Sequence, residues 1–105
     1  MSKRSSPEKM TQYILFIHRD TESEPTSDEW ESFFQSAAQS GMFRGGSAIG
    51  EREEIGDAQV AKPSDHIAGF MRFDSEDKQA VLDLLESHPV VIHGGCVELC
   101  VMSES

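Results

Sequence analysis

Long hydrophobic runs and basic residues are what this 105-residue sequence has least of. No apolar stretch approaches the roughly 20 residues that a membrane-spanning helix needs. The first ten residues, MSKRSSPEKM, lack the apolar segment of a secretion signal. Only 9 Lys and Arg residues stand against 19 Asp and Glu, which gives a net charge of −10 that repels phosphate groups. We therefore expect a soluble cytoplasmic protein that binds neither nucleic acid nor membranes.

Cysteine is also scarce, and both cysteines lie in the segment HPVVIHGGCVELC (88–100). Two cysteines do not make a disulfide framework. The alternation in VELCV favours a strand, which separates Cys96 from Cys100 by about 13 Å at roughly 3.3 Å per residue. Neither one zinc ion nor one disulfide can bridge that distance, although a helix would bring the two residues together. The sequence thus predicts free thiols, no metal and no cofactor.

Two common site signatures are missing as well. The segment RGGSAIG (44–50) is rich in glycine, but no helix is expected after it and it has no lysine in the phosphate-loop position. No serine lies in a G-x-S-x-G nucleophile motif. A nucleotide-binding loop and a nucleophile elbow are therefore not expected.

Hydrophobic periodicity predicts four strands, over 11–19, 42–55, 66–73 and 96–102, with a linker at 56–65. Thr26 and Glu29 have the spacing of a capping box, and Gly41 suits the C-cap of the helix between them. A second helix is expected from a cap at Asp74 or Ser75 to Pro89, which stops it. Residues 1–10 are expected to form a disordered arm, which leaves one domain over 11–103.

The order β-α-β-β-α-β is typical of an α+β, ferredoxin-like fold, in which a four-stranded antiparallel sheet carries two helices on one face. In the first strand, Ile14 and Phe16 alternate with Tyr13, Leu15 and Ile17, so both faces of this strand are apolar. Two helices cover only one face, and a second copy of the chain is the simplest cover for the other. The pattern therefore predicts a homodimer through the sheet face.

Two histidines are candidate catalytic bases, because imidazole titrates near neutral pH. His88 stands before Pro89 at the expected end of the second helix, where the helix dipole favours a cation. The simpler alternative is a helix-terminal histidine bonded to a carbonyl. His93 precedes two glycines, where backbone can approach a ligand closely. The alternative is an exposed loop histidine.

Arg72 and His18 are candidate ligand-binding residues. Arg72 is flanked by apolar residues on a strand, where it is either an anchor for an anion inside a pocket or an edge residue that extends to solvent. His18 closes the first strand beside charged residues, so a surface position is the alternative to a ligand contact. Arg72 would hold an anionic group of a small molecule.

Several phrases of the sequence, taken in order, resemble one protein family. YILFIHRD, SGMFRGGSAIG, IAGFMRFDSED and HPVVIHGGCVELCVM are similar to segments of the YCII-related, or DGPF-motif, family over about residues 11–102. The resemblance implies a ferredoxin-like fold of the dimeric α/β-barrel group. Some members resemble muconolactone-isomerase-type enzymes, and a few act on chlorinated aromatic rings through a histidine–aspartate pair.

This chain departs from that pattern at the catalytic pair. Where enzymatic members carry a histidine early in the first helix, this sequence has SDEWESF. Where they carry an aspartate before a proline, it has His88 before Pro89, and AKPSDHIAGF occupies the approximate place of the DGPF signature. The resemblance therefore implies the fold but does not transfer the catalytic pair.

Two functions of different classes follow. The first is a small-molecule enzyme that catalyses proton transfer or elimination on a cyclic or aromatic substrate, with His88 or His93 as general base and Arg72 holding an anionic group. The second is a non-catalytic dimeric module that binds a ligand or serves as an accessory protein. A histidine and Arg72 that converge on an open pocket would favour the enzyme.

Overall fold

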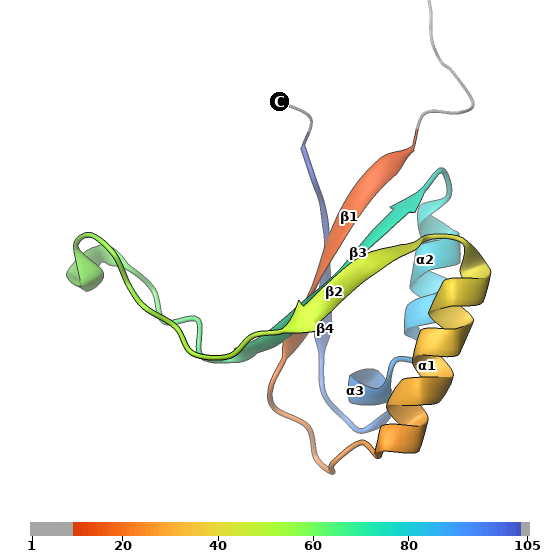
Figure 1. Ribbon diagram of the computed structural model, residues 1–105, viewed down its shortest axis with the longest axis horizontal. Helices are drawn as coiled ribbons and strands as arrows, with labels where there is room; N and C mark the ends of the chain where they lie inside the picture. The colour runs from red at the N-terminus through yellow and green to blue at the C-terminus, as the bar shows by residue number, and fades with distance from the viewer. Residues whose placement is uncertain (1–9, 104–105) are drawn as a thin grey trace, which may run out of the picture.

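The computed structural model describes residues 10–103 and shows an α+β fold (Figure 1). Strands β1 (Thr11–His18), β2 (Phe43–Ala48), β3 (Ile67–Ser75) and β4 (Val97–Val101) form an antiparallel sheet in the order β2-β3-β1-β4. Helices α1 (Ser27–Ser40), α2 (Lys78–Leu85) and α3 (Pro89–Ile92) lie on one face of it. The expected class and the antiparallel sheet are confirmed. The arm predicted over 1–10 lies outside the described residues except for Met10.

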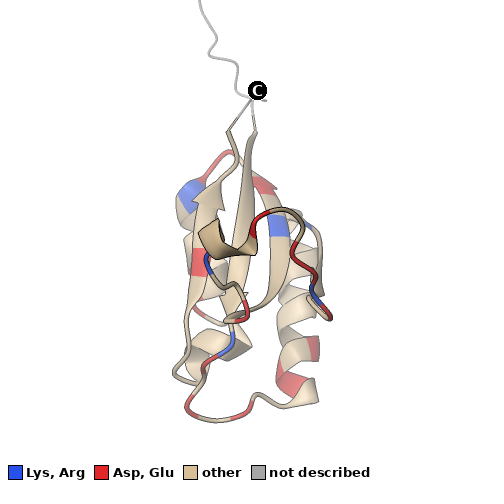
Figure 2. Ribbon diagram, turned by 90° about the vertical axis from the view of Figure 1, so that its left-hand side faces the viewer, with Lys and Arg blue, Asp and Glu red and all other residues tan. Residues whose placement is uncertain are grey.

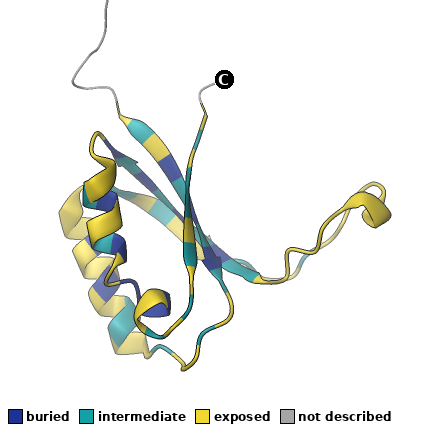
Figure 3. Ribbon diagram, turned by 180° about the vertical axis from the view of Figure 1, so that it is seen from behind, coloured by how far each residue is buried: buried dark blue, intermediate teal, exposed yellow. Residues whose placement is uncertain are grey.

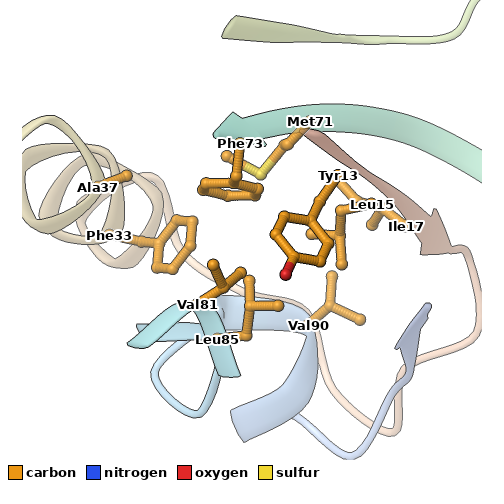
Figure 4. Close-up of a cluster of buried hydrophobic side chains, with 10 residues drawn as sticks. All are labelled: Tyr13, Leu15, Ile17, Phe33, Ala37, Met71, Phe73, Val81, Leu85 and Val90. Atoms are coloured by element: carbon orange, nitrogen blue, oxygen red, sulfur yellow. The ribbon is translucent and has the colours of Figure 1, made fainter. Parts of the chain in front are cut away.

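The inner strand β1 separates two chemically different surfaces. Tyr13, Leu15 and Ile17 are buried on the helix side, whereas Ile14 and Phe16 are half-buried on the opposite, open face. The register continues both faces across the sheet, since residues paired across adjacent strands point to the same side. The helix side holds the core (Figure 4), which consists of Tyr13, Leu15, Ile17, Phe33, Ala37, Met71, Phe73, Val81, Leu85 and Val90.

Both ends of α1 follow the prediction. The Thr26 side chain accepts a hydrogen bond from the Glu29 N–H, and the Glu29 carboxylate accepts one from the Thr26 N–H. Gly41 ends the helix with φ of 76°, a left-handed conformation that glycine adopts without steric cost. The capping box therefore fixes the position of Glu29 at the start of the helix.

The second strand is shorter than the predicted 42–55. Its register against β3 shifts between Phe43 and Gly46, and its pairing ends at Ala48. Residues 49–66 then leave the sheet as an arm that includes a single 3₁₀ turn, η2 (Ala58–Val60), and Figure 3 shows this arm as mostly exposed. The prediction of strand to residue 55 was wrong because the charged run over 51–54 buries no face.

The start of the second helix also differs from expectation. Strand β3 continues through Ser75, which is buried, and Asp77 caps α2 in place of Asp74 or Ser75. Helix α2 already ends at Leu85, and Pro89 begins α3 instead of stopping α2. Proline suits the first position of a helix because that position needs no N–H donor.

Acidic residues are spread over the loops and helices of the molecule (Figure 2). Over residues 10–103, no helix is both long and apolar enough to cross a membrane.

Candidate functional site

The four predicted site residues fall on opposite sides of the sheet. Arg72 lies between Met71 and Phe73, which are buried on the helix side, so its side chain points to the open face. His18 is on that same face of β1. His88 and His93 flank α3 on the helix side. Arg72 therefore does not converge with either candidate base.

His88 is a core residue and a helix cap. Its exposed fraction is 0%, and its Nδ1 accepts the Val90 N–H at 3.1 Å as the N-cap of α3. Burial lowers the pKa of this imidazole to about 4, so the ring is neutral at pH 7. The expectation that His88 ends α2, where a dipole would favour its cation, was wrong because the chain turns into a new helix there.

The Nε2 of His88 has no hydrogen-bond partner among residues 10–103. The ring meets Trp30 and Phe33 edge-on, with centroids 5.1 and 4.7 Å away. These aromatic faces are the available weak acceptors for an N–H group. Capping and packing thus explain His88 without a catalytic role.

His93 has a partner on each ring nitrogen. Its Nδ1 lies 2.6 Å from the Ser23 hydroxyl, and its Nε2 lies 2.8 and 2.9 Å from the two Glu29 carboxylate oxygens. Only 18% of the His93 side chain is exposed. Ser23 and Glu29 were not predicted as site residues, and the only signal was the capping box that placed Glu29 at the helix start.

The Glu29 carboxylate is held in its ionised form. The hydrogen bond from the Thr26 backbone N–H and then that from the His93 side chain lower the pKa of Glu29. An ionised carboxylate only accepts hydrogen bonds, so Nε2 of His93 must carry the proton in this pair. In the neutral ring Nδ1 is then unprotonated and accepts a hydrogen bond from the Ser23 hydroxyl group. Ser23, His93 and Glu29 therefore form one directed hydrogen-bond chain.

The two glycines after His93 help to position this hydrogen-bond chain. The Glu22 N–H donates to the His93 carbonyl at 2.9 Å, which ties the His93 turn to the loop before α1. At Gly94, where φ is 85°, a Cβ would lie 2.8 Å from the Glu22 side chain, and at Gly95 it would lie 2.9 Å from the Asp20 carbonyl. The two glycines thus let the backbone after His93 pack closely against the loop before α1, whereas the sequence suggested a close approach to a ligand.

A hollow of about 250 Å³ borders the Glu29 end of the Ser23–His93–Glu29 hydrogen-bond chain. Its lining combines an aromatic ring and an aliphatic side chain with three hydroxyl groups and the carboxylate, contributed by Phe33, Ile92, Ser32, Ser36, Ser87 and Glu29.

On the open face, Arg72 is half-buried and paired in register with Ile14. Its Nε is buried and has no partner in the part of the chain that the structure describes. His18 lies four residues from Ile14 along β1, which is about 13 Å. Its Nε2 is 3.2 Å from a Glu98 carboxylate oxygen, and its ring centroid is 5.3 Å from that of His66. Arg72 and His18 therefore belong to separate parts of the open face.

Cys96 is exposed just before β4, and Cys100 is half-buried within it; both are free thiols. Among residues 10–103, no three His, Cys, Asp or Glu side chains gather as a metal ion would require.

Comparison with models of protein families and with curated proteins finds no match for this chain.

Proposed function

We propose that this protein is a dimeric enzyme that catalyses proton transfer or elimination on a small cyclic or aromatic molecule, with His93 as its general base. The observation that carries the proposal is the directed chain from Ser23 through His93 to Glu29. An imidazole fixed by a carboxylate on one nitrogen keeps its other nitrogen unprotonated and able to accept a proton, which is the usual arrangement of a histidine base.

Ser23 is the solvent-exposed end of this chain. A substrate C–H placed against Ser23 Oγ can lose its proton to that oxygen while the hydroxyl proton passes to Nδ1 of His93. The electron pair of the C–H bond either stays as an enolate or forms a double bond as a leaving group departs. The resulting imidazolium is stabilised by Glu29 at its other nitrogen.

The strand order supports a ferredoxin-like fold and relatedness to the YCII-related family. The order β2-β3-β1-β4, with the helices on one face, is that of a split βαβ sheet. The enzymatic members' histidine–aspartate pair is absent here, and His88, which stands where they carry the aspartate, lies in the core. Glu29 in α1 and His93 after α3 form a different carboxylate–histidine pair. In this proposal the Glu29–His93 pair takes the place of the missing catalytic pair.

The open face supports the homodimer. Ile14, Phe16 and Phe70 are half-buried there although the described helices all lie on the other side. Face-to-face packing of two sheets would cover these side chains and bring an acceptor from the partner or from a ligand carboxylate to the guanidinium group of Arg72. In this proposal Arg72 and His18 serve the interface side, and the chemistry lies on the helix side.

Deuterium incorporation from D₂O tests the proposal directly. Cyclic ketones, lactones and aryl ketones, each with a C–H next to the carbonyl, would be screened by NMR for exchange in the presence of the full chain. We expect exchange in at least one compound class and a loss of about 100-fold or more in His93→Asn, because a positioned general base contributes about 10²–10⁴-fold.

His66→Asn is the matched control, because His66 is exposed and lies on the far side of the sheet from His93. Exchange at equal rates in His93→Asn and in the unchanged protein would overturn the role of His93. Binding without exchange would favour the non-catalytic module.

A further inference from the structure

The arm over residues 49–66 is held together by its own hydrogen bonds but leaves two large apolar side chains almost fully exposed. The Arg52 guanidinium donates to the carbonyls of Ser64, at 3.0 Å, and Ile67, which ties the two legs of the arm together. Yet Ile55 is 93% and Val60 is 79% exposed. Apolar side chains exposed to this degree gain free energy when a partner buries them.

The arm points away from the helices. Figures 1 and 3 show it leaving the sheet on the open-face side, beyond the ends of β2 and β3. This is the side on which the proposed second copy would be seated.

A second unexplained feature lies at the opposite edge of the sheet, on the helix side. It is a hollow of about 390 Å³ between α2, α3 and β4, whose lining is mostly apolar and consists of Leu82, Leu85, Val91, Val97 and Leu99 with the charged Lys78 and Glu86. Its walls include Leu82 and Val91, which are large apolar residues left partly exposed.

The arm cannot reach this hollow within its own chain. The arm is rooted at the β2–β3 edge and projects from the open face, whereas the hollow lies at the β4 edge on the other face. The strand pairing shows, however, that the base of the arm and the hollow lie toward the same end of the strands. Ile17 of β1 pairs with both Gly69, beside the arm, and Val97, in the hollow.

A two-fold axis between two facing sheets, parallel to their strands, brings the two features together. It sets the β2 edge of one copy over the β4 edge of the other and keeps equivalent strand ends on the same side. Facing sheets are about 10 Å apart. Ile55 lies seven residues after the end of β2 at Ala48, and Val60 lies seven residues before the start of β3 at Ile67. Seven extended residues span about 23 Å, so the arm can pass the partner's sheet edge and reach its helix layer.

We propose that Ile55 and Val60 of each arm occupy the apolar hollow between α2, α3 and β4 of a second copy of this chain. This inference rests on the homodimer of the proposed function and adds a reciprocal clasp at its two edges. Each copy contributes one arm and one hollow, as a two-fold interface requires.

A mixed-chain cross-link tests the clasp. In a Cys96→Ser, Cys100→Ala background, a chain with Ile55→Cys would be mixed with a differently sized, tagged chain with Val91→Cys and then oxidised. We expect a disulfide-linked heterodimer. Replacing Val91→Cys by Ser36→Cys, on the exposed side of α1, is the matched control and should give none.

Charge at the arm gives an independent readout. Ile55→Asp with Val60→Asp should weaken dimerisation about tenfold or more, since burial of one branched side chain alone is worth about that factor. Two results together would overturn the clasp and leave the sheet-face dimer standing. The Asp variant would dimerise at full strength, and the Ile55→Cys and Val91→Cys chains would form no disulfide. A background chain that sediments as a monomer would overturn both.

Discussion

His88 shows how neighbours decide what a histidine does. The same ring caps α3 through Nδ1 and fills the core between Trp30 and Phe33. Enclosure in apolar surroundings disfavours the charged form, which is why the pKa of His88 falls to about 4. At pH 7 His88 therefore caps α3 without placing a charge in the core.

The first prediction concerns acid stability. The pKa of His88 is about 4 in the folded chain, against about 6.5 for an unfolded histidine. Between these values the unfolded state binds the extra proton, so stability is retained above pH 6.5 and is lost as the pH falls toward 4. The loss from this residue is about 3 kcal/mol. In urea unfolding, His88→Asn, which can still cap, should show a correspondingly smaller decrease between pH 7.5 and pH 4.

The control for this titration is His66→Asn, which removes an exposed histidine and should keep the full decrease. If His88→Asn lost as much stability on acidification as the unchanged chain, the ring would not be held neutral in the core.

Among the elements, β1 and α1 were the most predictable from sequence. Strict alternation specified both faces of β1, and the Thr26–Glu29 spacing with Gly41 specified both ends of α1. The turn at Pro89 was not predictable in the same way. A proline after an apolar helical stripe stops a helix or begins one, and burial of His88 between two helices decides between them.

The site was predictable only in part, because its contacts are long-range. His93 was identified as a candidate, but Ser23 is 70 residues away and Glu29 is 64 residues away in the chain. Their meeting depends on how the Gly94-Gly95 turn packs on the loop before α1. Neither periodicity nor spacing reports such a contact. Alternation along β3 sets Arg72 opposite Met71 and Phe73, but which face the helices and His93 occupy depends on long-range packing that no local pattern encodes.

The β2–β3 pair supplies a prediction at the level of elements. A Cβ at Gly46 would clash with the Phe70 carbonyl oxygen, so the two strands pair closely only with glycine there. Gly46→Ala should therefore lower the free energy of unfolding by about 1–3 kcal/mol, the usual cost of overpacking. Denaturant unfolding measures this loss. Gly50→Ala, where a Cβ would meet nothing within 4 Å, is the matched control and should be nearly neutral; equal effects would contradict the close approach.

For the whole molecule, one sheet serves two purposes in this account. Its helix side holds the core and the Ser23–His93–Glu29 chain, and its open side carries half-buried apolar residues and Arg72. An uncovered apolar face of this kind is a liability for a monomer, and a second copy removes it.

The homodimer is the prediction at this scale. Sedimentation at micromolar concentration should report about twice 11.7 kDa. Phe16→Glu places a charge on the open face and should give a folded monomer, whereas Phe34→Glu, on the exposed side of α1, should leave the dimer intact. A stable monomer of the unchanged chain would refute the sheet-face dimer.

The proposed function depends most directly on where the proton of His93 lies. Nitrogen-15 NMR of the imidazole reports this, and Glu29→Gln provides the comparison because it keeps an acceptor for the Thr26 N–H but loses the carboxylate charge. In the neutral ring we predict a single tautomer with the proton on Nε2, and a shift toward mixed tautomers in Glu29→Gln. A proton on Nδ1, or tautomers that average freely in the unchanged protein, would contradict a base oriented by Glu29.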